Sequence, residues 1–244
     1  MRRIEFSVML WLLLLMGAVT AFSANYRREF GADWDAAVRF VNDNHEQFKK
    51  EFEIFGVDSR IAEAVVFPEL IRYSLWQDEI EKVAVNGLYI TKGKDAADFS
   101  IGRFQMKPSF AEEVEEAWNK SPLAQEYGFV FNVQQNSEAR RSRVRRLGTM
   151  EGQCRYLAIF IRLMQLRHPQ LAGMPAKERV RLLATAYNWS FSAPLSQIRR
   201  MQKKCRFHTD IIVTRKTKMY CYADIAQACL NALQASFCPI RHQQ

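Results

Sequence analysis

Apolar residues recur along much of this chain at the period of an α-helix. Between Trp34 and Phe55 they follow one another at alternating steps of three and four, with His45 in the same register, which is typical of an amphipathic helix packed on a core. Gly56 is suited to ending that helix, and Asp58 is suited to capping the next one. Residues 152–166 are apolar on nearly every side, which predicts a central buried helix. The pattern therefore indicates a mainly helical fold.

Four further helices complete the expected secondary structure. Pro108 suits the first turn of one of them, because its fixed φ fits a helix start and its missing N–H needs no partner there. The stretch 120–149 is polar and rich in arginine, which predicts a variable connection with short helices, and residues 205–218 could form a small hairpin. We expect the four helices at 78–90, 108–118, 176–187 and 222–233.

The domain organisation follows from this pattern and from the length of the chain. Its 244 residues are 48% hydrophobic and 25% charged, which suits one mid-sized domain with a full core and argues against disorder. We expect one mainly α domain over residues 25–200. A small cysteine-containing C-terminal extension, residues 201–244, is expected to pack on it.

The N-terminus has the layout of a secretory signal peptide, which we assign to residues 1–23. Arg2 and Arg3 precede an apolar run from Val8 to Met16, and small residues follow at 21–24. The run is shorter than the ~20 residues of a membrane helix, so we expect cleavage and no stable membrane insertion, with an uncleaved anchor as the alternative. The mature protein is then expected in the periplasm or associated with the cell envelope.

Five cysteines suggest cross-linking of the C-terminal extension. Cys154 lies in the expected central helix, and the other four lie in the extension, where an oxidising compartment would allow one or two disulfides. A zinc site is the less favoured alternative, because no Cys-x-x-Cys pair is present. We expect no metal and no cofactor. The cysteines of the extension are Cys205, Cys221, Cys229 and Cys238.

The net charge of +9, from 35 Lys and Arg against 26 Asp and Glu, favours anionic partners. Peptidoglycan, whose peptides carry free carboxylates, is one such polymer of the cell envelope. Nucleic acid is not expected as a partner, because no recognised binding motif is present. Much of the charge lies in one arginine cluster, which we interpret as a solvated helix face rather than a substrate-steering patch. Its members are Arg140, Arg141, Arg143, Arg145 and Arg146.

Three short segments carry the candidate chemistry. They are FPELIRYS around Glu69, GRFQMKPS from Gly102 to Ser109, and ATAYNWS around Tyr187 and Asn188. Glu69 continues the buried stripe of its helix, so a helical path directs its carboxyl inward. Pro68 just before it predicts a kink or a restart of the helix, and the alternative interpretation of Glu69 is an exposed residue in a new first turn.

In this order the three segments resemble those of the lysozyme-like lytic transglycosylases of the goose-type lysozyme superfamily. That family carries a glutamate on a helix, then Gly-x-x-Gln-Met-x-Pro-Ser/Thr, then Ala-Tyr-Asn. The resemblance covers roughly residues 58–190 and departs from the family at Leu70, where a serine usually follows the glutamate. It implies a lysozyme-like single domain that cleaves the β-1,4 bond between N-acetylmuramic acid and N-acetylglucosamine in peptidoglycan glycan strands.

The resemblance also implies roles for individual residues. Glu69 would be the single catalytic acid and base, with a pKa raised by partial burial, and the muramic acid 6-hydroxyl would attack the anomeric carbon without water. Gln105 can donate and accept hydrogen bonds at once, which suits a sugar, although a buried glutamine bonded to backbone is the alternative. The residues expected to bind substrate are Gly102, Gln105, Met106, Ser109, Tyr187 and Asn188.

Two other functions stay open at this point. An inverting muramidase needs a second carboxylate roughly 6.5–9.5 Å from the first, and Asp98, four residues before Gly102, is the candidate. The competing interpretation of Asp98 is an ordinary loop or helix-capping residue. A peptidoglycan-binding protein that kept the fold but lost turnover is the non-enzymatic alternative, favoured by Leu70 and the basic surface.

Overall fold

The computed structural model describes residues 26–73, 87–210 and 212–235. Within these ranges the regular structure is helical, with two isolated β-bridges and no strand, so the expected mainly α class is confirmed. The named helices are α2 (Ala32–Glu53), α3 (Ser59–Tyr73), α5 (Pro108–Asn119), α6 (Leu123–Glu126), α7 (Ser137–Leu147), α8 (Met150–Arg167), the 3-10 helix η1 (Pro169–Gly173), α9 (Ala176–Asn188), α10 (Leu195–Met201) and α11 (Tyr222–Ala235).

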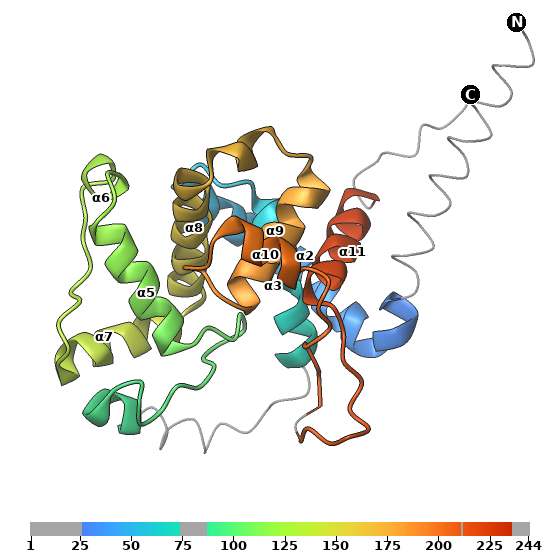
Figure 1. Ribbon diagram of the computed structural model, residues 1–244, viewed down its shortest axis with the longest axis horizontal. Helices are drawn as coiled ribbons and strands as arrows, with labels where there is room; N and C mark the ends of the chain where they lie inside the picture. Colours follow the sequence, from blue (N-terminus) through green and yellow to red (C-terminus); the bar gives the residue numbers. More distant parts are fainter. Residues whose placement is uncertain (1–25, 74–86, 211, 236–244) are drawn as a thin grey trace, which may run out of the picture.

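Helix α3 is enclosed by other helices. It packs against α2, α8, α9 and α11, and every residue from Ile61 to Ile71 is buried. In Figure 1, α5 to α7 lie to one side of α8, and α9 to α11 lie to the other. Pro68 lies inside α3, and the helix continues through it to Tyr73, so of the kink or restart expected there, the restart does not occur. A polar side chain in the last turns of α3 is therefore surrounded by the core.

The start of α3 follows the prediction from local sequence. Gly56 has a φ of +62°, a conformation that glycine adopts without steric cost after a helix end. The Asp58 Oδ1 atom accepts hydrogen bonds from the backbone N–H groups of Arg60 at 2.9 Å and Ile61 at 3.2 Å. This cap fixes where α3 begins, and therefore which of its turns carries Glu69.

The arginine-rich helix α7 differs from the predicted solvated face. Arg143 is 1% exposed, and its guanidinium lies 2.6 Å from Glu115 and 3.1 Å from Glu112. Arg140 is also buried, and its Nε atom donates to the Ile90 carbonyl at 2.8 Å. The prediction is wrong for these two arginines. Charge patterning along one helix could not show it, because the acidic partners of Arg143 lie on α5, 28 and 31 positions earlier.

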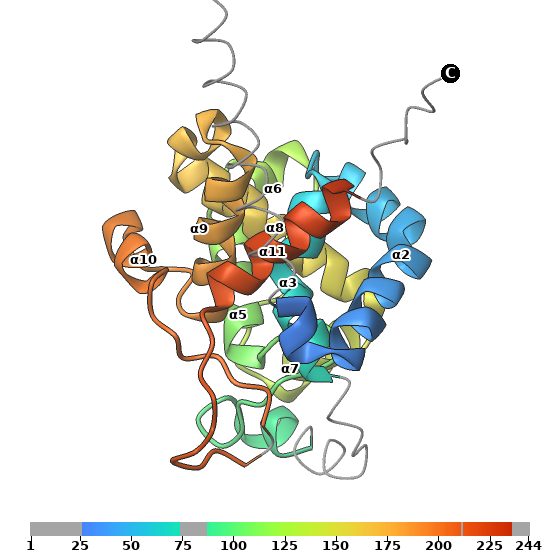
Figure 2. The same ribbon diagram turned by 90° about the vertical axis from the view of Figure 1, so that its right-hand side faces the viewer.

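The C-terminal part of the chain contributes to the core. Helix α11 packs against α3 and α9, and Figure 2 shows it crossing in front of α3. Its Ile225 and Cys229 are fully buried. The chain between α10 and α11 runs out as a long loop (Figure 1), which backbone hydrogen bonds between Phe207 and Tyr220 close. The hairpin expected at 205–218 amounts to this one bridge among the described residues.

The cysteines in the described ranges differ from the expected disulfide pattern. Cys154, Cys205, Cys221 and Cys229 are all free thiols. Cys154 and Cys229 are enclosed in the helical core, whereas the Cys221 thiol donates to the Gln202 carbonyl at 2.8 Å. The expected disulfides are therefore not formed among these four.

Several predictions from the sequence fall outside the described residues. These are Cys238, the signal segment at 1–23 and most of the helix expected at 78–90. In the part of the chain that is described, no helix combines the length and the apolar character needed to cross a membrane.

Candidate functional site

Glu69 lies near the C-terminal end of α3, where the core encloses its side chain. The residue is 4% exposed, and the Arg72 Nη1 atom lies 3.3 Å from its Oε2 atom. The loop between α10 and α11 holds Arg72, whose Nε donates to the His208 carbonyl at 3.0 Å and whose guanidinium lies 4.4 Å from the Phe207 ring centroid. A segment far along the chain therefore fixes the cation beside Glu69.

Burial raises the pKa of Glu69 to about 7 from an ordinary value of 4.5, and the positive charge of Arg72 opposes part of this shift. Within the described residues no donor forms a hydrogen bond to Oε2, so hydrogen bonding does not replace the lost hydration of that atom. Near neutral pH the protonated and ionised forms of this carboxyl are both well populated. Such a group can give a proton and accept one in turn.

Tyr187, from the third segment, connects Glu69 with the second segment. Its hydroxyl donates to the Phe104 carbonyl at 2.6 Å, and its ring packs against Phe110 and Phe160 at centroid distances of 5.2 and 5.8 Å. Burial, and then the nearby charge of Glu69, raise the pKa of Tyr187 well above its ordinary value, so the phenol stays protonated. The fold thus brings the three segments together.

The second segment begins with a tight turn whose shape requires glycine. Gly102 has a φ of +70°, and a Cβ at this position would lie 2.0 Å from the Gln153 Nε2 atom. Gln153 is buried, and its Oε1 accepts the Phe104 N–H at 2.8 Å. Gln105 has a φ of +50° and donates from Nε2 to the Gly102 carbonyl at 2.8 Å. A hydrogen bond from the Gln105 side chain to backbone was the alternative to sugar binding for this residue.

Met106 and Ser109, two further residues expected to bind substrate, stabilise the same segment. Met106 is 1% exposed and exchanges backbone hydrogen bonds with Ile101, which places it in the core rather than on a surface that a sugar could contact. Ser109 donates from its N–H and its hydroxyl to Asp98 at 3.0 and 2.8 Å, and the Lys107 Nζ lies 3.5 Å from the same carboxylate. Asp98 therefore stabilises the start of α5.

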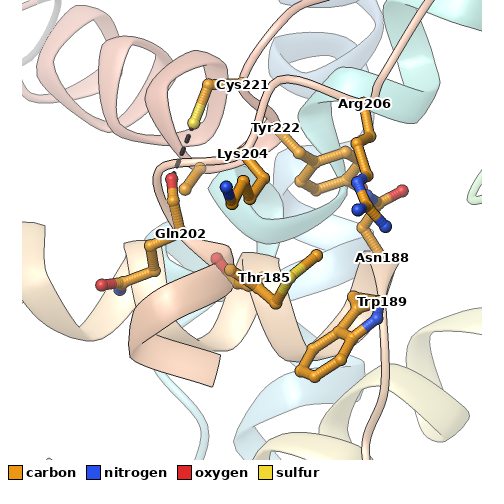
Figure 3. Close-up of a pocket in the computed structure, with 10 residues that line it drawn as sticks. Thr185, Asn188, Trp189, Gln202, Lys204, Arg206, Cys221 and Tyr222 are labelled. Atoms are coloured by element: carbon orange, nitrogen blue, oxygen red, sulfur yellow. Dashed lines mark hydrogen bonds between the residues drawn. The ribbon is translucent and has the colours of Figure 1, made fainter. Parts of the chain in front are cut away.

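Asn188, which was also expected to bind substrate, lines a surface pocket together with Tyr222. It is exposed at the C-terminal end of α9, and the pocket, of about 190 Å³, lies between this helix end and the connection from α10 to α11 (Figure 3). Burial, and then the charge of Glu69, raise the pKa of Tyr222. Tyr222 therefore belongs both to the pocket and to the surroundings of Glu69. The polar lining includes Thr185, Asn188, Trp189, Gln202, Lys204 and Arg206.

Sequence reasoning missed Arg72 and Tyr222 as parts of this site. Arg72 follows Glu69 by three positions, which places both on one helix face, so their proximity could have been predicted. Tyr222 was expected only as the first residue of the helix at 222–233. Its proximity to Glu69 depends on the packing of α11 against α3, for which the sequence carries no local signal.

Comparisons with protein-family models, with curated proteins and with solved structures found no match for the chain. Among the described residues, no three His, Cys, Asp or Glu side chains are grouped so that they could hold a metal ion. The function of this site must therefore be inferred from its geometry alone. That geometry consists of a buried carboxyl with a raised pKa, a tyrosine that interacts with it electrostatically, and a turn that accepts a hydrogen bond from the tyrosine.

Proposed function

We propose that this protein is a peptidoglycan lytic transglycosylase that cleaves the bond between N-acetylmuramic acid and N-acetylglucosamine, with Glu69 as its single acid and base. The observation that carries the proposal is the buried Glu69 carboxyl, with a pKa of about 7, electrostatically coupled to Tyr187. The resemblance of the three segments to the lysozyme-like family supports the same assignment. We also propose secretion to the periplasm or cell envelope, where this polymer lies.

Glu69 can serve both halves of such a reaction. In its protonated form it gives a proton to the glycosidic oxygen as the bond to the anomeric carbon of muramic acid breaks and positive charge develops there. The carboxylate then takes the proton of the muramic acid 6-hydroxyl, whose oxygen bonds to the anomeric carbon. The products are an anhydro end and a free 4-hydroxyl on N-acetylglucosamine. No water is consumed, and Glu69 is protonated again.

A single carboxylate suits this site better than the pair that an inverting hydrolase needs. Asp98 accepts hydrogen bonds from the Ser109 N–H and hydroxyl, one on each oxygen, and Lys107 lies beside it. A catalytic base must direct a lone pair at the attacking water, whereas these contacts hold the Asp98 carboxylate against the start of α5. In our proposal Asp98 supports the second segment and takes no part in proton transfer.

The glycan must reach a carboxyl whose side chain is 6% exposed. Substrate entry therefore requires neighbouring groups to move. The contacts of Arg72 with Phe207 and His208 are suited to release during substrate entry. They join α3 to a loop that projects from the helices rather than to another core helix. Release of these contacts would free Arg72 and open the side of Glu69 that it covers.

Mass spectrometry of the muropeptides released from purified peptidoglycan tests the proposal. We expect the wild-type chain to release anhydro-muropeptides, and Glu69→Gln to lower the rate by about 10²- to 10⁴-fold, because the amide cannot act as acid and base. Asp98→Asn is the matched comparison. It keeps an oxygen that accepts the Ser109 N–H, so it should retain most of the activity.

Other products would lead to a different assignment. Reducing-end products that are lost in both Glu69→Gln and Asp98→Asn would indicate an inverting muramidase that uses the two carboxylates. Binding of the glycan without any product from the wild-type chain would overturn the enzymatic proposal and leave a peptidoglycan-binding protein.

A further inference from the structure

The pocket that contains Asn188 carries an excess of positive charge. Lys204 and Arg206 line it, and none of the residues that line it is acidic. Figure 3 shows the Arg206 guanidinium close to Asn188 and to the Tyr222 ring. Trp189 lies at the other edge of the pocket and is 39% exposed. Two cations, an amide and an aromatic ring therefore converge on one opening.

The charge of these two cations is not neutralised by any residue that the structure describes. Lys204 and Arg206 are both exposed, and neither forms an ion pair within the described ranges. By contrast, Arg199 on the neighbouring helix α10 lies 3.6 Å from Glu178. Cations that line a concave site without a counter-charge raise the local concentration of anions. The pocket is therefore suited to an anionic ligand.

The wall of the pocket also offers a buried hydrogen-bond donor. Tyr222 is 4% exposed, and its hydroxyl has no partner among the described residues. Gln202 also lines the pocket, and its backbone carbonyl accepts a hydrogen bond from Cys221, but Figure 3 shows its side-chain amide pointing away from the other lining residues. A buried donor without an acceptor is unfavourable, so acceptor oxygens on a ligand would improve the hydrogen bonding of this wall.

The pocket adjoins the proposed catalytic centre through Tyr222. This residue lines the pocket and lies within electrostatic range of Glu69 and Tyr187. A ligand in the pocket would therefore lie beside the bond that Glu69 cleaves. In peptidoglycan the sugar at that bond, muramic acid, bears a peptide with free carboxylates on its lactyl group. An anionic group is thus attached close to the reacting atoms of the substrate.

We propose that this pocket binds a carboxylate of the peptide attached to muramic acid, so that the protein prefers peptide-bearing glycan to bare glycan. Lys204 and Arg206 supply the charge, Tyr222 supplies a donor, and Trp189 provides an apolar surface at the rim. The inference rests on the proposed function, because that function places muramic acid at Glu69.

Calorimetric binding measurements test the inference on the chain carrying Glu69→Gln, which leaves the ligand uncleaved. Three ligands are compared: the disaccharide with its tripeptide, the same molecule with its carboxylates converted to amides, and the disaccharide alone. We expect the added pair Lys204→Gln and Arg206→Gln to weaken binding of the first ligand at least about tenfold, because two charge-assisted contacts are lost. Binding of the other two ligands should not change.

The matched control is the pair Arg215→Gln and Lys216→Gln. It removes the same charge from exposed positions of the same loop that do not line the pocket, so it should leave all three affinities unchanged. Equal affinity for the three ligands before the substitutions, or an equal loss with the control pair, would overturn the assignment of the pocket.

Cleavage assays separate this inference from the proposed function. If the wild-type chain cuts bare and peptide-bearing glycan at the same rate, the transglycosylase proposal stands and the pocket assignment falls. If it releases no product, yet binding of the charged ligand still depends on Lys204 and Arg206, the enzymatic proposal falls and the pocket assignment stands. Thermal unfolding of each variant confirms that the substituted chains remain folded.

Discussion

Glu69 keeps its proton to a higher pH in the folded chain than in the unfolded chain, because burial raises its folded pKa to about 7 from the ordinary 4.5. Between these values the unfolded chain releases the proton first, so the free energy of unfolding falls as pH rises through this window and then levels off. We predict that Glu69→Gln removes roughly 2–3 kcal/mol of the fall between pH 5 and pH 8. Urea denaturation of both chains at about pH 5 and about pH 8 measures the difference.

Glu113 provides the control for this measurement, because it is an exposed glutamate on α5. Glu113→Gln should show the same decline in stability with pH as the wild-type chain. An unchanged decline in Glu69→Gln would contradict the assignment of the raised pKa to this residue.

The contribution of the Tyr187 hydroxyl to the free energy of unfolding can also be measured by itself. Tyr187→Phe leaves the Phe104 carbonyl without the donor that now lies 2.6 Å away. We predict a loss of roughly 1–3 kcal/mol in the free energy of unfolding, the cost of a buried acceptor without a partner. Tyr127→Phe is the comparison, since its ring stacks on Phe55 and its hydroxyl bonds to no described residue. Equal stability losses in the two variants would contradict the role given to the Tyr187 hydroxyl.

Among the elements, the turn at Gly102 positions the carbonyl that Tyr187 contacts. Gly102→Ala forces a Cβ onto Gln153, which would have to release the Phe104 N–H, and it also places alanine at a φ of +70°. We predict a destabilisation of about 2–4 kcal/mol from backbone strain and the lost hydrogen bond together. Chemical denaturation gives the value.

A substitution at Gly128 separates the cost of backbone strain from the cost of the contact between an added Cβ and Gln153. Its φ is +69°, and a Cβ there would meet nothing within 4 Å. Gly128→Ala should therefore cost only the backbone term, about 1–2 kcal/mol. If both alanine variants lose the same stability, the contact with Gln153 is not what requires glycine at position 102.

At the scale of the whole molecule, a buried ionic network joins α5, α7 and α8. Arg143 contacts Glu112 and Glu115 on α5, and Glu115 also accepts hydrogen bonds from Arg146 and from Tyr156 on α8. Arg143→Met leaves buried carboxylates without their main cation, so we predict a loss of about 3–5 kcal/mol in the free energy of unfolding. Urea denaturation tests this value.

Arg141→Met is the control for the network, because Arg141 is exposed on the same helix. It should change stability by no more than about 0.5 kcal/mol. Adding Glu115→Gln to Arg143→Met should recover part of the loss, since it removes one of the unpaired charges. A loss that persists unchanged in this double variant would point to packing rather than to charge.

The correct and the wrong predictions from the sequence differ in the range of the interactions involved. The cap at Asp58, the helix start at Pro108 and the inward direction of Glu69 each depend on residues within a few helical turns, and all three are present. The solvated interpretation of Arg143 failed because its partners lie on another helix. Met106 was expected to bind substrate, but its packing in the core was decided by distant residues.

By itself, then, the sequence determined most of the longer helices that the structure describes, several of their ends and the burial of Glu69, because capping and apolar periodicity act over short stretches of chain. Only the tertiary structure decided what surrounds that carboxyl. The contact between Tyr187 and Phe104 joins positions 83 residues apart, and that of Arg72 with His208 joins positions 136 apart. Such contacts depend on how whole helices pack against one another, and no local pattern specifies that packing.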